Sequence, residues 1–322
     1  MKKFFSLSIV ACVSLFGFKN ISYSNEIKSS SLKIETTIPY LKDLVSKASC
    51  DSKSFQVNSI ISMGNDPHTF HITPANRVAI AKADIIVLIG SGLENWLTKI
   101  KRTKNQTWLN VTESMILRKL SESEMSSHNH DHDHGHDHSH DHDHQHLEYD
   151  PHIWQSPSLT KEALLKISAT LIKLKPDEKK NIESCTQDYI KNIDENIVEL
   201  KKLSQSISEE KRVIATNHDA LGYFAKEFGF KIYSIVGLSD ESAPTAAQLK
   251  KIISQLKKDK INTVFLESTG NMRNIQTVAK EANVKIGGTL YSDSLGAKDS
   301  GAETAPDMWR TNMNTIVSAL KK

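Results

Sequence analysis

The chain has 322 residues, of which 25% are charged, with 41 basic side chains against 38 acidic ones. Residues 1–24 contain three lysines and no acidic residue, so the rest of the chain carries no formal net charge. Proteins that bind nucleic acid or a charged membrane surface show a clustered excess of charge, and this balance argues against both classes.

A leader segment is predicted at residues 1–24. Two lysines precede an apolar stretch at residues 4–18, and small residues stand before a cleavage point ahead of Asn25. This pattern is typical of a secretory signal peptide, and the stretch is too short to span a membrane. The residues that end at Cys12 also resemble a lipoprotein motif. The apolar stretch continues beyond Cys12, however, which favours simple cleavage and a periplasmic location.

Strands and helices are predicted to alternate along the rest of the chain. In residues 25–176, β-type runs are expected at residues 32–37, 55–61, 85–89 and 108–111, and helices at 39–48, 74–82, 93–101 and 157–174. In residues 208–322, β-type runs are expected at residues 213–216, 231–235, 263–266 and 285–286, and helices at 221–228, 244–257, 275–282 and 307–320. This alternation predicts an α/β fold with parallel sheets, arranged as two βα lobes.

A long amphipathic helix is predicted between the two lobes, at residues 177–207. The segment contains neither glycine nor proline, and apolar residues recur in it at steps of three and four. That spacing places the apolar residues on one face of a single helix, which we expect to be a rigid connector rather than a flexible linker.

Residues 128–146 form a histidine-rich run, with ten histidines and five aspartates in nineteen residues. Because the run has nothing apolar to bury, it predicts a solvated, disordered loop at about residues 121–147. Neutral imidazoles bind divalent metals such as zinc, so auxiliary low-affinity metal binding is expected here. The histidines concerned are His128, His130, His132, His134, His136, His138, His140, His142, His144 and His146.

Four further side chains follow the carboxyl ends of predicted strands: His68, His152, His218 and Asp293. Ligands of open α/β sheets bind beyond these ends, so the four loops can converge on a cleft between the lobes. Three imidazoles and one carboxylate suit a tetrahedral zinc ion. Taken singly, each histidine can also be interpreted as a hydrogen-bonded loop residue. Asp293 can likewise be interpreted as a cap of a turn or helix.

Five motifs carry a resemblance to a known family. They are Asp66-Pro67-His68-Thr69-Phe70, Asp150-Pro151-His152-Ile153-Trp154, His218-Asp219-Ala220-Leu221-Gly222-Tyr223-Phe224, Gly287-Gly288-Thr289-Leu290-Tyr291-Ser292-Asp293-Ser294-Leu295 and Asp307-Met308-Trp309-Arg310. Together they resemble the zinc- and manganese-binding solute-binding proteins of ABC importers, known as cluster A-I, over essentially the whole chain after the leader. Within that family they are most similar to the periplasmic high-affinity zinc-uptake type.

The resemblance implies a fold, a site and partners. Two βα lobes joined by a rigid helix would hold the metal in the cleft between them, with His68, His152, His218 and Asp293 as ligands. A histidine-rich loop ahead of the second ligand is similar to the zinc-specific branch, so Zn²⁺ is the expected cargo and Mn²⁺ the alternative. The expected partners are a permease in the inner membrane and a separate ATPase subunit. The binding protein itself is expected to be a monomer without enzymatic activity.

Two other classes of function stay open at this point. A secreted zinc hydrolase would need an open coordination position and a general base, a role that Glu267 could take only if Asp293 were not a ligand. A metal-storage protein would use the histidine-rich run as its main site.

Three residues have an undecided role. His71 stands where relatives often have glutamate, and we interpret it as a surface histidine rather than an additional ligand. Cys50 and Cys185 are the cysteines that follow the leader, and the sequence allows either one disulfide or two free thiols.

Overall fold

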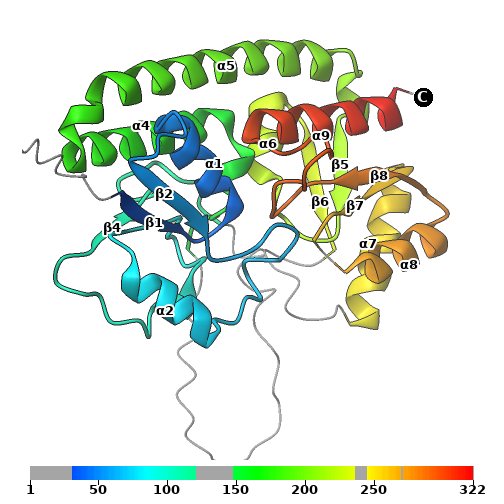
Figure 1. The fold of residues 1–322 in the computed structure, drawn as a ribbon. Coiled ribbons are helices and arrows are strands. Elements are labelled where there is room, and N and C mark those ends of the chain that lie inside the picture. The colour runs from blue at the N-terminus through cyan, green and yellow to red at the C-terminus, as the bar shows by residue number, and fades with distance from the viewer. Residues whose placement is uncertain (1–30, 121–147, 236–244, 270, 322) are drawn as a thin grey trace, which may run out of the picture. The chain divides into compact units, whose positions relative to one another are not determined.

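The first half of the chain is built on a four-stranded parallel sheet. The computed structural model describes residues 31–120, 148–235, 245–269 and 271–321, and places these strands in the order β2-β1-β3-β4 (Figure 1). All neighbouring strands are parallel. The strands are β1 (Leu32–Thr36), β2 (Phe55–Ser59), β3 (Ile85–Leu88) and β4 (Thr107–Asn110).

Three helices of this half have the predicted bounds: α1 (Pro39–Ala48), α2 (Pro74–Lys82) and α4 (Pro157–Leu174). Each begins with a proline in its first turn, where the missing N–H group costs no helical hydrogen bond and the fixed φ suits the helix. The side chains of Thr73 and Ser156 also accept backbone N–H groups at the starts of α2 and α4. These local signals explain why the sequence located the helices well.

The helix predicted at residues 93–101 is wrong, because the structure has only a 3-10 turn at Asn95–Leu97. The Glu94 carboxylate accepts the backbone N–H groups of Ile89 and Gly90 at 2.8 and 2.9 Å, and so ties this turn to the end of β3. Leu97 is buried from an irregular segment. The spacing between Leu97 and the preceding apolar residues is the same as in a helix, although this segment is not helical.

The second half contains two pairs of parallel strands. β5 (Val213–Thr216) pairs with β6 (Lys231–Ser234), and β7 (Thr263–Glu267) pairs with β8 (Lys285–Leu290). The helices are α6 (Gly222–Phe228), α7 (Ala246–Lys258), α8 (Met272–Ala282) and α9 (Ala305–Leu320).

Strand β8 is longer than the predicted run at residues 285–286, because Gly287 and Gly288 belong to the strand rather than to a turn. A Cβ atom on Gly287 would lie 2.8 Å from the side chain of Ala319, and one on Gly288 would lie 2.6 Å from the side chain of Thr315, both of which belong to α9. The two glycines therefore allow α9 to pack closely on β8.

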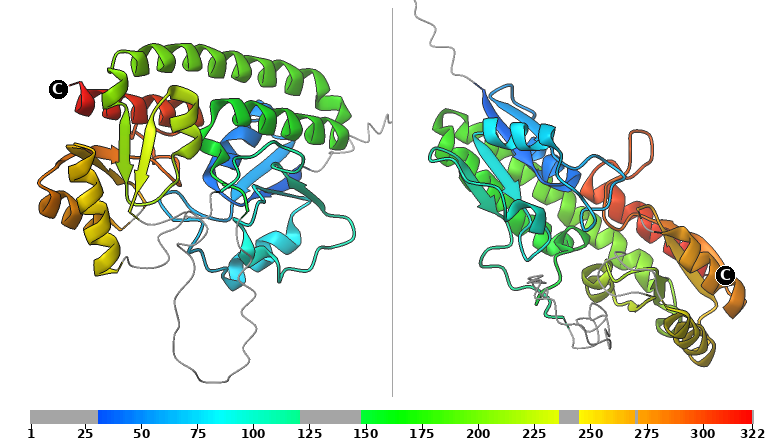
Figure 2. Two further views of the ribbon diagram at one scale, coloured as in Figure 1. Left: turned by 180° about the vertical axis from the view of Figure 1, so that it is seen from behind. Right: turned by 90° about the horizontal axis from the view of Figure 1, so that it is seen from below.

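The long helix is α5 (Lys179–Gln205), preceded by a 3-10 turn at Pro176–Glu178. It packs against α1 and α4 from the first half and α9 from the second, and it lies along these helices in Figures 1 and 2. The α/β class with parallel sheets and one long helix is thus confirmed. The division into lobes at residues 25–176 and 208–322 stays a prediction, and one hydrophobic core contains side chains from β1 to α9.

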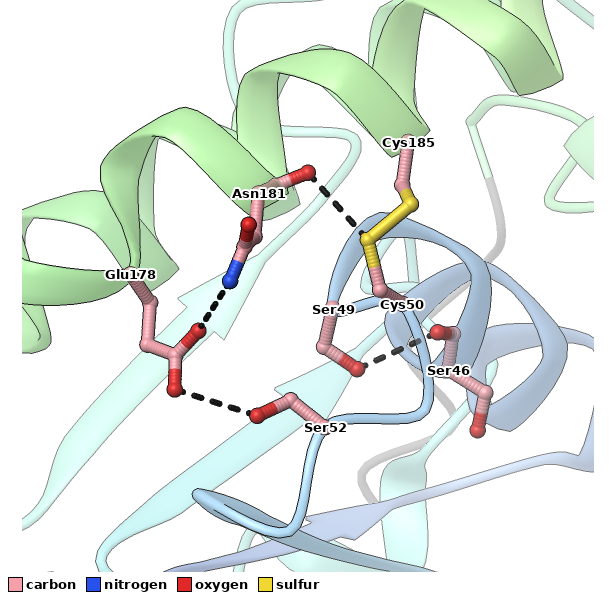
Figure 3. The surroundings of a disulfide bond; sticks show 7 residues. All are labelled: Ser46, Ser49, Cys50, Ser52, Glu178, Asn181 and Cys185. Carbon is pink, nitrogen blue, oxygen red and sulfur yellow. Dashed lines mark hydrogen bonds between the residues drawn. A yellow bond between two sulfur atoms is a disulfide. The ribbon is translucent and has the colours of Figure 1, made fainter.

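A disulfide settles the pairing that the sequence left open. Cys50, just after α1, is bonded to Cys185 on α5 (Figure 3). Beside this bond, the Ser52 hydroxyl donates a hydrogen bond of 3.1 Å to the carboxylate of Glu178, at the start of the same helix. The loop after α1 is therefore attached to the N-terminal end of α5 by both a covalent bond and a polar contact.

Two predicted segments lie outside the described residues. They are the leader at residues 1–24 and the histidine-rich loop at about residues 121–147. Among the residues that the structure describes, no helix is both long and apolar enough to cross a membrane.

Candidate metal centre

The structure brings together the four side chains singled out by the sequence. His68 follows β2, His152 precedes a 3-10 turn at Ile153–Gln155, His218 follows β5 and Asp293 follows β8. One possible ligand atom from each of the four lies within 4.8 Å of the others. The convergence follows from the topology, because the carboxyl ends of parallel strands face the same side of their sheet.

The distances between these atoms fit a small tetrahedral ion. His68 Nε2 lies 3.0 Å from His152 Nε2, and Asp293 Oδ1 lies 3.3 Å from His218 Nε2. Asp293 Oδ1 lies 3.6 Å from His152 Nε2 and 3.9 Å from His68 Nε2. Zinc–nitrogen bonds of 2.0–2.1 Å would separate the ligand atoms of a tetrahedron by about 3.3–3.4 Å. The donor set therefore has the chemistry of a zinc site, and its spacings lie close to those of a tetrahedral ion.

Both Asp-Pro-His tripeptides form the same local turn. The Asp66 carboxylate accepts the backbone N–H of His68 at 2.8 Å, and the Asp150 carboxylate accepts the backbone N–H of His152 at 3.0 Å. Such an aspartate turn closes on the residue two positions later, and the intervening proline restricts the backbone. In both copies of the tripeptide, the aspartate thus holds the backbone of the histidine in place.

Two buried carboxylates orient two of the imidazoles. Asp150 Oδ1 lies 2.7 Å from His152 Nδ1, and Glu267 Oε2 lies 2.5 Å from His218 Nδ1. An ionised carboxylate can only accept, so the hydrogen bond to Asp150 assigns the proton of His152 to Nδ1 and leaves Nε2 of that ring for a metal. Glu267 Oε1 also accepts the backbone N–H of His218 at 2.9 Å. Both oxygens of Glu267 are therefore directed at His218.

Residues near Asp293 are fixed by side chains from the first half of the chain. The Trp154 indole N–H and the Gln155 amide each donate a hydrogen bond of 2.6 Å to the carbonyl oxygen of Ser292. The Thr269 hydroxyl donates to Asp293 Oδ2 at 3.1 Å. His152 and Asp293 consequently belong to one hydrogen-bonded assembly, although 141 positions separate them in the sequence.

The pKa shifts in the site differ from one imidazole to another. Burial, together with the nearby His152 ring, lowers the pKa of His68 to about 3. Burial alone would also lower the pKa of His218, but the negative charges of Asp293 and Glu267 raise it well above its usual value. Burial favours the neutral form of Asp293, yet the three imidazoles hold its pKa below its usual range. The metal-free site therefore favours a neutral His68 and a protonated His218 beside the Asp293 carboxylate.

Zinc binding should weaken as the pH falls, because the ion must displace the proton of His218. Because one proton is displaced below the raised pKa of His218, the affinity is expected to decrease with falling pH there, by up to about tenfold per pH unit. Chelator-competition titrations at several pH values measure this slope, and calorimetry in two buffers of different ionisation enthalpy counts the released proton. An affinity independent of pH over this interval would contradict the charge state assigned to His218.

Of the four histidines that the structure describes, His71 does not join the cluster formed by the other three. Its side chain is exposed, and the group of possible metal ligands among the described residues consists of His68, His152, His218 and Asp293. This agrees with the interpretation of His71 as a surface residue.

Two residues near the site, Asp150 and Arg118, had no predicted role. Asp150 is fully buried beside His152, and Arg118 donates to its second oxygen from Nε at 2.8 Å. The repeated Asp-Pro-His tripeptide was a usable signal for Asp150. The sequence gives no comparable signal for Arg118, which lies 32 positions before its partner.

The fold and the donor set are those of a metal-binding α/β protein. The model of the family described as "Zinc-uptake complex component A periplasmic" matches residues 34–319. The chain belongs to this family.

The names of this chain's relatives mention two different metals, zinc and manganese. The high-affinity zinc uptake system protein ZnuA of Bacillus subtilis is 28% identical, over 99% of this chain and 98% of its own length. The manganese-binding lipoprotein MntA of Halalkalibacterium halodurans is 26% identical, over 90% of this chain and 89% of its own length. Among solved structures, the periplasmic zinc-binding protein TroA of Treponema pallidum is similar with a TM-score of 0.79 and 25% identity, covering 90% of this chain and 99% of that one.

Proposed function

We propose that this protein is the zinc-binding component of an ABC importer, which captures Zn²⁺ outside the cytoplasmic membrane and delivers it to a membrane permease. The observation that carries the proposal is the buried group of three imidazoles and one carboxylate, with spacings suited to a tetrahedral ion. Membership of the zinc-uptake family and the names of the relatives support the transport role.

Zinc is preferred over manganese on the chemistry of the ligands. Manganese favours oxygen donors, whereas this site offers three nitrogen atoms and one carboxylate. Manganese remains the alternative cargo, because several relatives are named as manganese-binding proteins.

A binding role accounts for the site better than a hydrolase does. Four protein ligands fill a tetrahedral shell and leave no position for a reactive water. Glu267, the candidate base, directs both of its oxygens at His218. We therefore propose that the protein has no enzymatic activity of its own.

The proposed partners are a permease and an ATPase on separate chains, with the binding protein acting as a monomer. The proposed location is the periplasm, after cleavage of the leader before Asn25. Several relatives are named lipoproteins, which favours the alternative in which Cys12 is acylated and anchors the chain. The mass of the mature N-terminus separates the two forms, because acylation at Cys12 leaves a longer, heavier chain.

Deleting residues 128–146 should leave one tightly bound zinc ion per chain and remove only weak additional binding. Protein purified without added metal should contain zinc, and Zn²⁺ should displace Mn²⁺ in direct competition with either form of the chain. These results are measured by elemental analysis and by chelator-competition titration. Loss of the tight site on deletion would instead support a storage role for the histidine-rich run, and displacement of zinc by manganese would support the alternative cargo.

A further inference from the structure

Arg118 joins two loops that carry different predicted metal ligands. Its Nε donates to Asp150 Oδ2 at 2.8 Å, and its Nη2 donates to Asp219 Oδ2 at 2.9 Å. Asp150 is two positions before His152 and Asp219 directly follows His218. One guanidinium group thus connects the loop of the second ligand with the loop of the third.

Asp150 divides its two oxygens between Arg118 and His152. Oδ1 accepts the backbone N–H of His152 at 3.0 Å and lies 2.7 Å from the ring Nδ1, while Oδ2 accepts from Arg118. The Asp150 side chain is completely buried. A buried carboxylate keeps its charge and its orientation only when both oxygens have partners, so Arg118 determines how firmly Asp150 holds the imidazole.

The backbone of Arg118 is fixed from both sides. Its N–H donates to the Tyr223 hydroxyl at 3.0 Å, and its carbonyl oxygen accepts the N–H of Asp150 at 2.9 Å. The Tyr223 hydroxyl in turn donates to the carbonyl oxygen of Asp150 at 2.8 Å. Next to this arrangement, Lys119 and Tyr149 form an antiparallel bridge. These hydrogen bonds therefore hold in place the backbone that carries the guanidinium group.

The start of α6 leaves space for the guanidinium group. A Cβ atom on Gly222 would lie 2.5 Å from Arg118 Cζ and 2.6 Å from Nη2. Any larger residue at position 222 must displace the Arg118 side chain, which two charged hydrogen bonds hold in place. Gly222 therefore offers a way to disturb the guanidinium group without removing its charge.

We propose that Arg118 is a positioning residue of the metal centre, which acts through Asp150 and Asp219 to fix His152 and His218 relative to each other. The inference rests on the proposed zinc-binding function and deepens it. Carboxylates and other groups that orient metal-bound histidines typically account for a 10–100-fold change in metal affinity, and Arg118 holds one of these carboxylates in place.

The test compares Arg118→Met with Arg118→Lys, Gly222→Ala and Arg310→Met in the full chain. Arg310 is the matched control, because it also bridges two carboxylates, those of Glu199 and Asp307, each at 3.2 Å. Zinc affinity is measured by chelator competition, and the geometry of the site by the visible absorption of bound Co²⁺. Thermal unfolding of the metal-free proteins separates loss of fold from loss of positioning.

Arg118→Met should lower zinc affinity about 10–100-fold and alter the Co²⁺ spectrum. Arg118→Lys should recover part of the loss, since an ammonium group replaces the charge but not the two-pronged geometry. Gly222→Ala should cause a smaller loss of the same kind, and Arg310→Met none. If Arg118→Met does not fold because Asp150 and Asp219 are left without their cation, Arg118→Lys and Gly222→Ala provide the same comparison.

Wild-type affinity and an unchanged Co²⁺ spectrum in the folded Arg118 and Gly222 variants would overturn the positioning role while leaving the proposed function intact. An equal loss in Arg310→Met would also overturn it, because the effect would then be general. A wild-type chain that binds no zinc in the same assay would reject the proposed function, and this inference with it.

Discussion

Replacing His152 by alanine should weaken zinc binding by more than about 100-fold, beyond the usual effect of losing a residue that only orients a ligand. The change removes a ligand whose Nε2 lies 3.0 Å from that of His68. It also leaves the buried Asp150 carboxylate without the imidazole that it contacts at 2.7 Å. Both effects act on the metal site directly, so the loss should exceed that of any other single substitution considered above.

His71→Ala is the matched control, because it removes an exposed histidine that precedes α2 and lies three positions after His68. Its zinc affinity should remain within a few-fold of that of the wild type. Chelator competition measures both variants, and circular dichroism checks that each is folded. Equal losses in His71→Ala and His152→Ala would contradict the assignment of ligands.

Removing the Cys50–Cys185 disulfide should lower the free energy of unfolding by about 3–5 kcal/mol. The bond joins residues 135 positions apart, and a cross-link over so long a segment strongly restricts the unfolded chain. The native helix should persist without it, since α5 also buries Ile182, Ile193 and Leu200 against the main core.

Denaturant titration of Cys50→Ser/Cys185→Ser, compared with the wild type under oxidising and reducing conditions, measures this difference. Reduced wild type should match the double variant, and zinc affinity should be unaltered because neither cysteine belongs to a ligand-bearing loop. A difference below about 1 kcal/mol would show that native packing alone holds the loop after α1 to α5.

Local signals explain which parts of the fold were predictable. Proline at the starts of α1, α2 and α4, with side-chain caps at Thr73 and Ser156, marked helix boundaries that depend on only a few neighbouring residues. The strand order β2-β1-β3-β4 depends on pairing between distant segments, and no local pattern specifies it. The strand predicted at residues 285–286 was too short, because the glycines that follow it continue the strand and allow α9 to pack closely.

The same distinction applies to the site. The four side chains were singled out because they were expected beyond the ends of strands, and the structure brings them together as the α/β topology predicts. Their role as ligands stays a prediction. The role of Asp150 could also have been predicted, because its tripeptide occurs twice in the sequence. That of Arg118 could not, since its partners Asp150 and Asp219 lie 32 and 101 positions away and are brought to it only by the fold.

The bridge between Lys119 and Tyr149 has a consequence for how such a chain can change during evolution. Leu120 N–H donates to the carbonyl oxygen of Glu148 at 3.1 Å, so the two ends of the histidine-rich segment are already side by side. Closing a segment between adjacent ends costs only about 0.6 kcal/mol more for each doubling of its length. Insertions, deletions and repeat expansion between residues 121 and 147 are therefore nearly neutral for folding. Selection can adjust the number of histidines there while the residues around His152 stay unchanged.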